Sequence, residues 1–153
     1  RIMTVHDDVF ARIESLLEDE DDWVSAMSTV ACELHTSFEH FHWTGFYRTV
    51  KPNVLKIGPY QGGHGCLVIP FSRGVCGAAA RTGVVQLVAD VNAFEGHIAC
   101  ASSTQSEVVL PVWNDEGTLL GVFDIDSNQP AAFTQEDADQ LAAILKSTFA
   151  QAR

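Results

Sequence analysis

The sequence has 153 residues, the size of one domain, and such a domain can bury about two-thirds of its unfolded surface without cross-links. A formal net charge of −11 argues against a nucleic-acid partner, because binding to phosphates needs clustered Lys and Arg. No apolar run approaches the roughly 18 residues of a membrane span, and the amino-terminal RIMTVHDDVF does not have the pattern of a signal peptide. We therefore expect a cytoplasmic protein without membrane contact, whose four cysteines are reduced thiols rather than structural staples.

The first part of the chain predicts two helices. Apolar residues at Val9, Ile13, Leu16 and Leu17 have helical spacing and precede the acidic run 18–22. Asp21 or Asp22 can cap a second helix. Its predicted apolar stripe consists of Trp23, Met27, Val30, Ala31, Leu34 and Phe38. Cys32 lies inside this helix, and we expect it to be a small buried hydrophobe.

Strand patterns begin at Phe41. The segments HWTGFYRTV and VLKIGPY flank the turn Lys51-Pro52-Asn53 and predict a β-hairpin. Trp43 and Tyr47 fall on one face of the first strand, so they should lie side by side. Their spacing favours half-buried sheet residues over a ligand-facing role.

The middle of the chain brings two cysteines to the ends of short elements. A flexible glycine-rich loop, GGHG, precedes Cys66 and a strand over 67–71. A tight turn then leads into a short helix that Thr82-Gly83 ends, and a strand over 84–88 follows. Because Cys76 stands near the amino terminus of that helix, unsatisfied N–H groups should lower its pKa and make it a reactive thiolate.

A third cysteine, Cys100, lies in the long polar loop from Asp90 to Ser106. Loops of this length without secondary structure are uncommon in compact domains unless they have a function. The loop therefore favours Cys100 as the reactive thiol as strongly as the helix terminus favours Cys76.

The last part of the chain predicts a hairpin over 107–113 and 118–126, then a helix. In its second strand Asp124 and Asp126 share one face, and surface exposure and a role in a site are equally consistent with that pattern. Thr134 and Asp137 have the spacing of a capping box for the final helix. The order of elements predicts an α+β domain over 1–153, with a largely antiparallel sheet covered on one face by helices, and it resembles a GAF domain.

Three chemistries could use the thiols. A zinc site could draw on Cys66, Cys76, Cys100, His64 and His97, but no CxxC pair is present, so we expect no metal. A cysteine hydrolase could pair His97 with Cys100. A redox enzyme needs an attacking thiolate, a resolving thiol and flexible segments that let them meet, and this description fits best.

Five segments resemble the free methionine-R-sulfoxide reductase family, which consists of small GAF-domain enzymes. They are HWTGFY, GPYQG with the following Cys66, IPFSRGVCGAAA, ADVNAFEGHIACASSTQSEVVLPV and LLGVFDIDS. The resemblance runs from about Phe41 to Asp126 and continues more weakly into both end helices. The cysteine trio of the family matches Cys66, Cys76 and Cys100.

The resemblance implies a reaction on free methionine-R-sulfoxide. Cys100 would attack the substrate sulfur, Cys66 would resolve the sulfenic acid as a disulfide, and Cys76 would be an auxiliary thiol. Glu107, Asp124 and Asp126 match the acidic residues of the family's site, and one of them would supply the proton. Trp43 and Tyr47 would surround the methyl sulfide end of the substrate. No cofactor is implied beyond an external dithiol reductant such as thioredoxin.

The competing class is a non-catalytic GAF sensor that binds a small molecule. Such a module should keep its ligand response after Cys100→Ser, whereas an enzyme should lose turnover. GAF domains often pair through their terminal helices, so a homodimer is an expectation by analogy.

Overall fold

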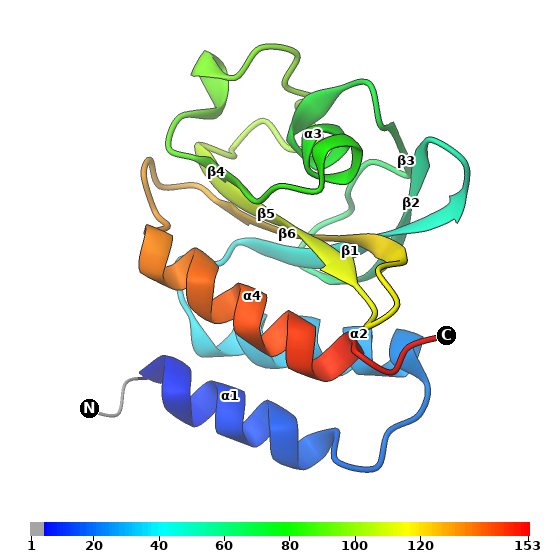
Figure 1. Cartoon of the computed structure of the whole chain (residues 1–153). Coiled ribbons are helices and arrows are strands. Elements are labelled where there is room, and N and C mark those ends of the chain that lie inside the picture. The colour runs from blue at the N-terminus through cyan, green and yellow to red at the C-terminus, as the bar shows by residue number, and fades with distance from the viewer. Residues whose placement is uncertain (1–4) are drawn as a thin grey trace.

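The centre of the protein is a six-stranded antiparallel sheet with the order β3-β2-β1-β6-β5-β4, seen in a computed structural model that describes residues 5–153 (Figure 1). The strands are β1 Trp43–Lys51, β2 Val54–Gln61, β3 Val68–Pro70, β4 Gln86–Val88, β5 Ser106–Trp113 and β6 Leu119–Ser127. The two predicted hairpins are the pairs β1–β2 and β5–β6. Strand β6 also pairs with β1, so it joins the two hairpins at the middle of the sheet.

Helices cover both faces of this sheet. The helices α1 Val5–Leu16, α2 Trp23–Ser37 and α4 Gln135–Phe149 lie on one face, with α1 farthest from the strands, and α3 Gly74–Thr82 lies on the other (Figure 1). The prediction that helices cover only one face was therefore wrong. The α3 helix packs Val75, Ala79 and Ala80 on the sheet because these small side chains let it approach closely.

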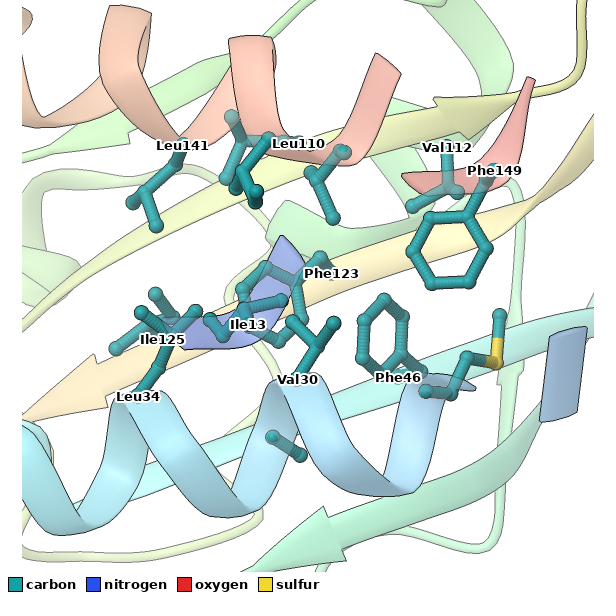
Figure 2. Close-up of a cluster of buried hydrophobic side chains, with 14 of the residues drawn as sticks. Ile13, Val30, Leu34, Phe46, Leu110, Val112, Phe123, Ile125, Leu141 and Phe149 are labelled. Atoms are coloured by element: carbon teal, nitrogen blue, oxygen red, sulfur yellow. The ribbon is translucent and has the colours of Figure 1, made fainter. Parts of the chain in front are cut away.

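The larger core lies between the sheet and the three-helix face (Figure 2). Its side chains come from all three helices and from the central strands, and they include Ile13, Val30, Leu34, Phe46, Leu110, Phe123, Ile125, Leu141 and Phe149. Phe46 and Phe123 stack with ring centroids 4.3 Å apart. Burying one such side chain stabilises the fold by about 1.5–3 kcal/mol, so this core supplies most of the support for the sheet.

Helices α2 and α4 begin directly after the predicted capping residues. The Asp22 carboxylate accepts hydrogen bonds from the N–H groups of Val24 and Ser25 at the start of α2. At the start of α4, Thr134 and Asp137 bond reciprocally to each other's backbone N–H groups, which is the predicted capping box. Both caps satisfy N–H groups that the first helical turn leaves without partners.

Cys32 is exposed, and the prediction that it is buried was wrong. The buried residues of α2 are Ala26, Met27, Val30, Ala31 and Leu34. One position beyond Ala31 rotates a side chain by about 100°, which takes Cys32 out of this stripe. Leu16 likewise turns to solvent at the end of α1, while Val9 and Ile13 are buried.

The loop between β4 and β5 contains the short 3₁₀ helix η1 Val91–Ala93 and otherwise has the irregular form expected from its composition. Within residues 5–153, none of the helices combines the length and the hydropathy needed to cross a membrane.

Thr134→Ala is expected to destabilise the protein by about 1 kcal/mol, because it removes the side-chain half of the capping box on α4. Urea unfolding would measure this change. Ser147→Ala, an exposed position of the same helix, is the matched control and should leave the midpoint unchanged or raise it slightly, because alanine has the higher helix propensity. Equal effects of the two substitutions would contradict a stabilising role for the cap.

Candidate active site

A pocket lies on the α3 face of the sheet, enclosed by the β2–β3 and β4–β5 loops, with a cavity of about 40 Å³. Seven of the eight predicted site residues line it: Trp43, Tyr47, Cys76, Cys100, Glu107, Asp124 and Asp126. The eighth, Cys66, is bonded to Cys100 but is not part of the lining. Residues far apart in the sequence thus meet at one place, as the resemblance implied.

Three carboxyl groups form the floor of the pocket. In the β5–β6 register Glu107 lies opposite Asp126, and Asp124 is two residues back along β6, so all three project from one face. One oxygen from each lies within 4.8 Å of the others. Glu107 and Asp124 are buried and Asp126 is half-buried, and one oxygen of each aspartate has no hydrogen-bond partner from the protein.

Burial and mutual repulsion favour the protonated form of these acids. Burial, followed by the charge of Glu107, raises the pKa of Asp124 from 3.8 to about 7. Burial and then the Asp124 charge raise the pKa of Asp126 well above its usual range. Near neutral pH the cluster therefore holds at least one proton, which it can give to a bound acceptor.

His97 was considered in the sequence only as a zinc ligand or a hydrolase base. The structure places its Nε2 atom 3.6 Å from Glu107 Oε2, at the edge of the pocket. The facing Glu107 carboxylate raises the pKa of His97, against the opposing effect of its own burial. Within residues 5–153, His97 is the one basic side chain that pairs with the acidic cluster, and only long-range folding brings the two together.

Trp43 and Tyr47 form an aromatic wall. Their rings stack with centroids 5.7 Å apart, as their shared face in β1 predicted. The Trp43 indole donates a hydrogen bond of 2.7 Å to the carbonyl of Gly63 and so anchors the loop that leads to Cys66. A Cβ atom at Gly65 would lie 3.0 Å from the Trp43 ring and 3.0 Å from the Tyr47 hydroxyl, which explains why a glycine stands there.

Cys66 and Cys100 are joined by a disulfide, with their Cα atoms 5.3 Å apart. The bond ties the β2–β3 loop to the β4–β5 loop above the acidic cluster. This is the pairing that the resemblance implied, and it shows that the two thiols can meet without disrupting the sheet.

Cys76 does not have the lowered pKa predicted from its position near the start of α3. Burial, followed by the negative field of Asp124, raises the pKa of its thiol well above the usual range. Only 5% of the residue is exposed. The helix terminus is outweighed because burial and nearby carboxylates both disfavour the thiolate.

The oxygens of Glu107, Asp124 and Asp126 are close enough together to hold a metal ion. A trio that shares protons is the other way to relieve their repulsion, and the raised pKa values of both aspartates accord with it. The zinc site considered from the sequence cannot form in this state, because Cys66 and Cys100 are bonded to each other instead of being thiolates.

Comparison with known proteins agrees with this fold. The model of the GAF domain family matches residues 18–148. The free methionine-R-sulfoxide reductase of Saccharomyces cerevisiae is 37% identical over 87% of this chain and 77% of its own. The chain belongs to this family of GAF-domain oxidoreductases.

Two solved structures extend the comparison. The Neisseria meningitidis free methionine-R-sulfoxide reductase in complex with its substrate is 41% identical, covers 95% of this chain and 89% of its own, and has a TM-score of 0.86. The reduced Staphylococcus aureus protein is 36% identical, covers 99% and 97% respectively, and has a TM-score of 0.91. The single-domain α+β architecture is thus confirmed as the fold of the family.

Asp124→Asn is expected to reduce the pH dependence of stability. Between pH 3.8 and about 7 folded wild type keeps a proton that the unfolded chain has released, so its stability falls as pH rises through this window. From pH 5 to pH 8 the wild-type Tm should therefore fall by roughly 5–10 °C more than that of the variant.

Thermal unfolding of the disulfide-bonded proteins would measure this difference. Asp19→Asn makes the same change of side chain at an exposed turn and serves as the control. Parallel loss of Tm in wild type and Asp124→Asn would show that Asp124 is not held protonated.

Proposed function

We propose that the protein reduces free L-methionine-R-sulfoxide to L-methionine, with Cys100 as the attacking thiolate. The observation that carries this proposal is the position of Cys100, which lines the same pocket as three clustered acids and bonds to a second cysteine. Nucleophilic attack, proton donation and resolution of the sulfenic acid can then each be assigned to a group in the site. The names of the similar proteins support the choice of substrate.

In the first step the Cys100 thiolate attacks the sulfur of the sulfoxide while a carboxyl group protonates the sulfoxide oxygen. The oxygen ends as the hydroxyl of a sulfenic acid on Cys100, and the electron pair returns to the sulfur of methionine. Asp124 suits the role of acid, because its pKa of about 7 lets it hold a proton and still release it. Glu107 and Asp126 complete the site that orients the sulfoxide.

In the second step the Cys66 thiol attacks the Cys100 sulfenic acid, and water leaves as the disulfide forms. A dithiol reductant of the thioredoxin type restores both thiols, and no bound cofactor or metal takes part. Cys76 is buried and stays protonated, so it lines the pocket as an auxiliary thiol and does not attack the substrate. Recycling by thioredoxin places the enzyme in a reducing compartment such as the cytoplasm.

Substrate selection follows from the lining of the pocket and from the loops beside it. Trp43 and Tyr47 offer apolar faces to the methyl sulfide end, and the acids bind the polar sulfoxide. The β2–β3 and β4–β5 loops both line the pocket, and we expect them to exclude the flanking chain of a methionine sulfoxide within a peptide. The free amino acid is therefore the preferred substrate.

Cys100→Ser should lower turnover of free methionine-R-sulfoxide by more than about a thousandfold with dithiothreitol as reductant. Free S-sulfoxide and a peptide-bound sulfoxide should not be consumed by wild type. Methionine release measured by chromatography would test both. Cys32→Ser, the exposed cysteine on the other face of the sheet, is the matched control and should keep full activity, as should protein treated with EDTA.

Two outcomes would change the account. No turnover by reduced wild type would move the assignment to a small-molecule sensor. Activity that survives Cys100→Ser but is lost in Cys76→Ser would keep the reaction and overturn the choice of nucleophile.

The disulfide-bonded protein should bind the sulfoxide at least about tenfold more weakly than Cys100→Ser, which can neither react nor close the bond. The reason is space, because a cavity of about 40 Å³ has room for only a few water molecules. Isothermal titration calorimetry with both proteins would measure the difference. Equal affinities would show that the disulfide leaves the substrate site open.

A further inference from the structure

Two exposed apolar side chains directly follow the disulfide cysteine Cys66. Leu67 is 65% exposed and Val68 is 51% exposed, and Leu67 is the most exposed large hydrophobic residue of the part of the chain that the structure describes. Neither lines the substrate pocket. Because consecutive residues of an extended chain point to opposite faces, these two side chains flank the edge of the sheet on its two sides, where a segment of another protein added to that edge would contact both.

The strand that holds Val68 is an open edge. β3 pairs only with β2, and the other side of β3 is the end of the sheet (Figure 1). The Ile57 N–H donates to Leu67 O, so in antiparallel alternation the N–H and C=O of Val68 point away from β2. These groups can bind an extended segment of a partner by adding to the edge of the sheet.

The charges near this edge differ from those of the whole chain. Exposed Lys56 lies opposite Val68, and exposed Arg73 follows the strand, with its N–H bonded to Pro70 O. The chain as a whole has a net charge of −11 and only nine Lys and Arg. The edge therefore offers an apolar centre with cationic neighbours, which suits a partner whose own apolar site has an acidic rim.

The two sulfurs of the disulfide face different surroundings. Both cysteines are half-buried, but Cys100 lines the substrate pocket, whereas Cys66 does not and directly precedes the exposed Leu67 and Val68. A protein thiolate that approaches along β3 therefore reaches Cys66 first. Attack there would release Cys100 into the pocket as the thiolate that the next substrate needs.

We propose that the sheet edge formed by Leu67 and strand β3, with the exposed side chains of Leu67 and Val68, is the docking surface for a protein dithiol of the thioredoxin type that attacks Cys66. The inference rests on the proposed function, because only a disulfide formed in each turnover needs a dedicated reductant. It adds to that function the docking surface and the sulfur attacked.

The two thiols of the partner supply the two electrons that reduction of the Cys66–Cys100 disulfide requires. The first, as a thiolate, bonds to the Cys66 sulfur, and the Cys66–Cys100 bond breaks with its electron pair on Cys100. The second thiol, after losing its proton, attacks the partner's own sulfur in the mixed disulfide, and Cys66 leaves as a thiolate that takes up a proton. Two electrons pass from the partner dithiol to the protein, and the partner is left as a disulfide.

The test compares Leu67→Asp and Val68→Asp with wild type, using purified thioredoxin and, separately, dithiothreitol to reduce the disulfide. The KM for thioredoxin should rise at least about tenfold in both variants, while the rate with dithiothreitol stays unchanged. Val84→Asp is the matched control, because Val84 is 58% exposed and precedes β4 at the opposite edge of the sheet. It should affect neither reductant.

An unchanged KM for thioredoxin in both variants would overturn the docking surface, and so would equal losses with both reductants. The experiment starts from the disulfide-bonded protein and measures directly the recovery of free thiols at Cys66 and Cys100. The result therefore does not depend on sulfoxide turnover. Absence of turnover with dithiothreitol would instead count against the proposed function.

A thioredoxin whose second active-site cysteine is replaced by serine should trap a mixed disulfide on Cys66, identified by peptide mass spectrometry. A trap on Cys100 would overturn the direction of attack.

Discussion

The two-residue alternation of β6 is the constraint on which the rest of the structure depends. Phe123 and Ile125 point into the helix-covered core, and Asp124 and Asp126 between and after them point into the pocket. A slip of one residue would bury the carboxylates among phenylalanines and expose the core side chains. The apolar core therefore fixes the register that places the acids, and the free energy of hydrophobic burial offsets the cost of crowding three carboxyl groups.

The cost of that crowding is what makes the site chemically useful. Isolated on the surface, Asp124 would be ionised at neutral pH and could not donate a proton. Buried beside Glu107, it has a pKa of about 7, and Cys76 next to it stays a thiol for the same reason. The same field opposes a thiolate on any cysteine that is held close to the acids. Cys100 lies on a loop rather than on the packed α3 helix, so it can be near the acids without being buried among them.

Much of the fold could be predicted from local patterns. Helical spacing, the Thr134–Asp137 capping box and the two hairpins all appear in the structure because each depends on neighbouring residues. The short helix α3 was predicted, but its place on the second face of the sheet was missed, because the side of a sheet that a helix covers depends on the path of the chain and not on the helix's own residues. The raised pKa of Cys76 and the exposure of Cys32 depend on what packs around each residue, and spacing along the chain does not reveal it. The link between His97 and Glu107 likewise requires the closed sheet. The family resemblance singled out the residues that meet in the pocket, whereas spacing alone did not decide whether Cys76 or Cys100 is the attacking thiol.

The most direct test of the central claim is a single turnover without external reductant. Pre-reduced protein, freed of dithiothreitol, would be mixed with excess free methionine-R-sulfoxide, and methionine and the state of each cysteine would be measured. The account predicts one methionine per chain and a disulfide between Cys66 and Cys100, with Cys32 and Cys76 still reduced. Sulfoxide that remains unconsumed while all four cysteines stay reduced would contradict it.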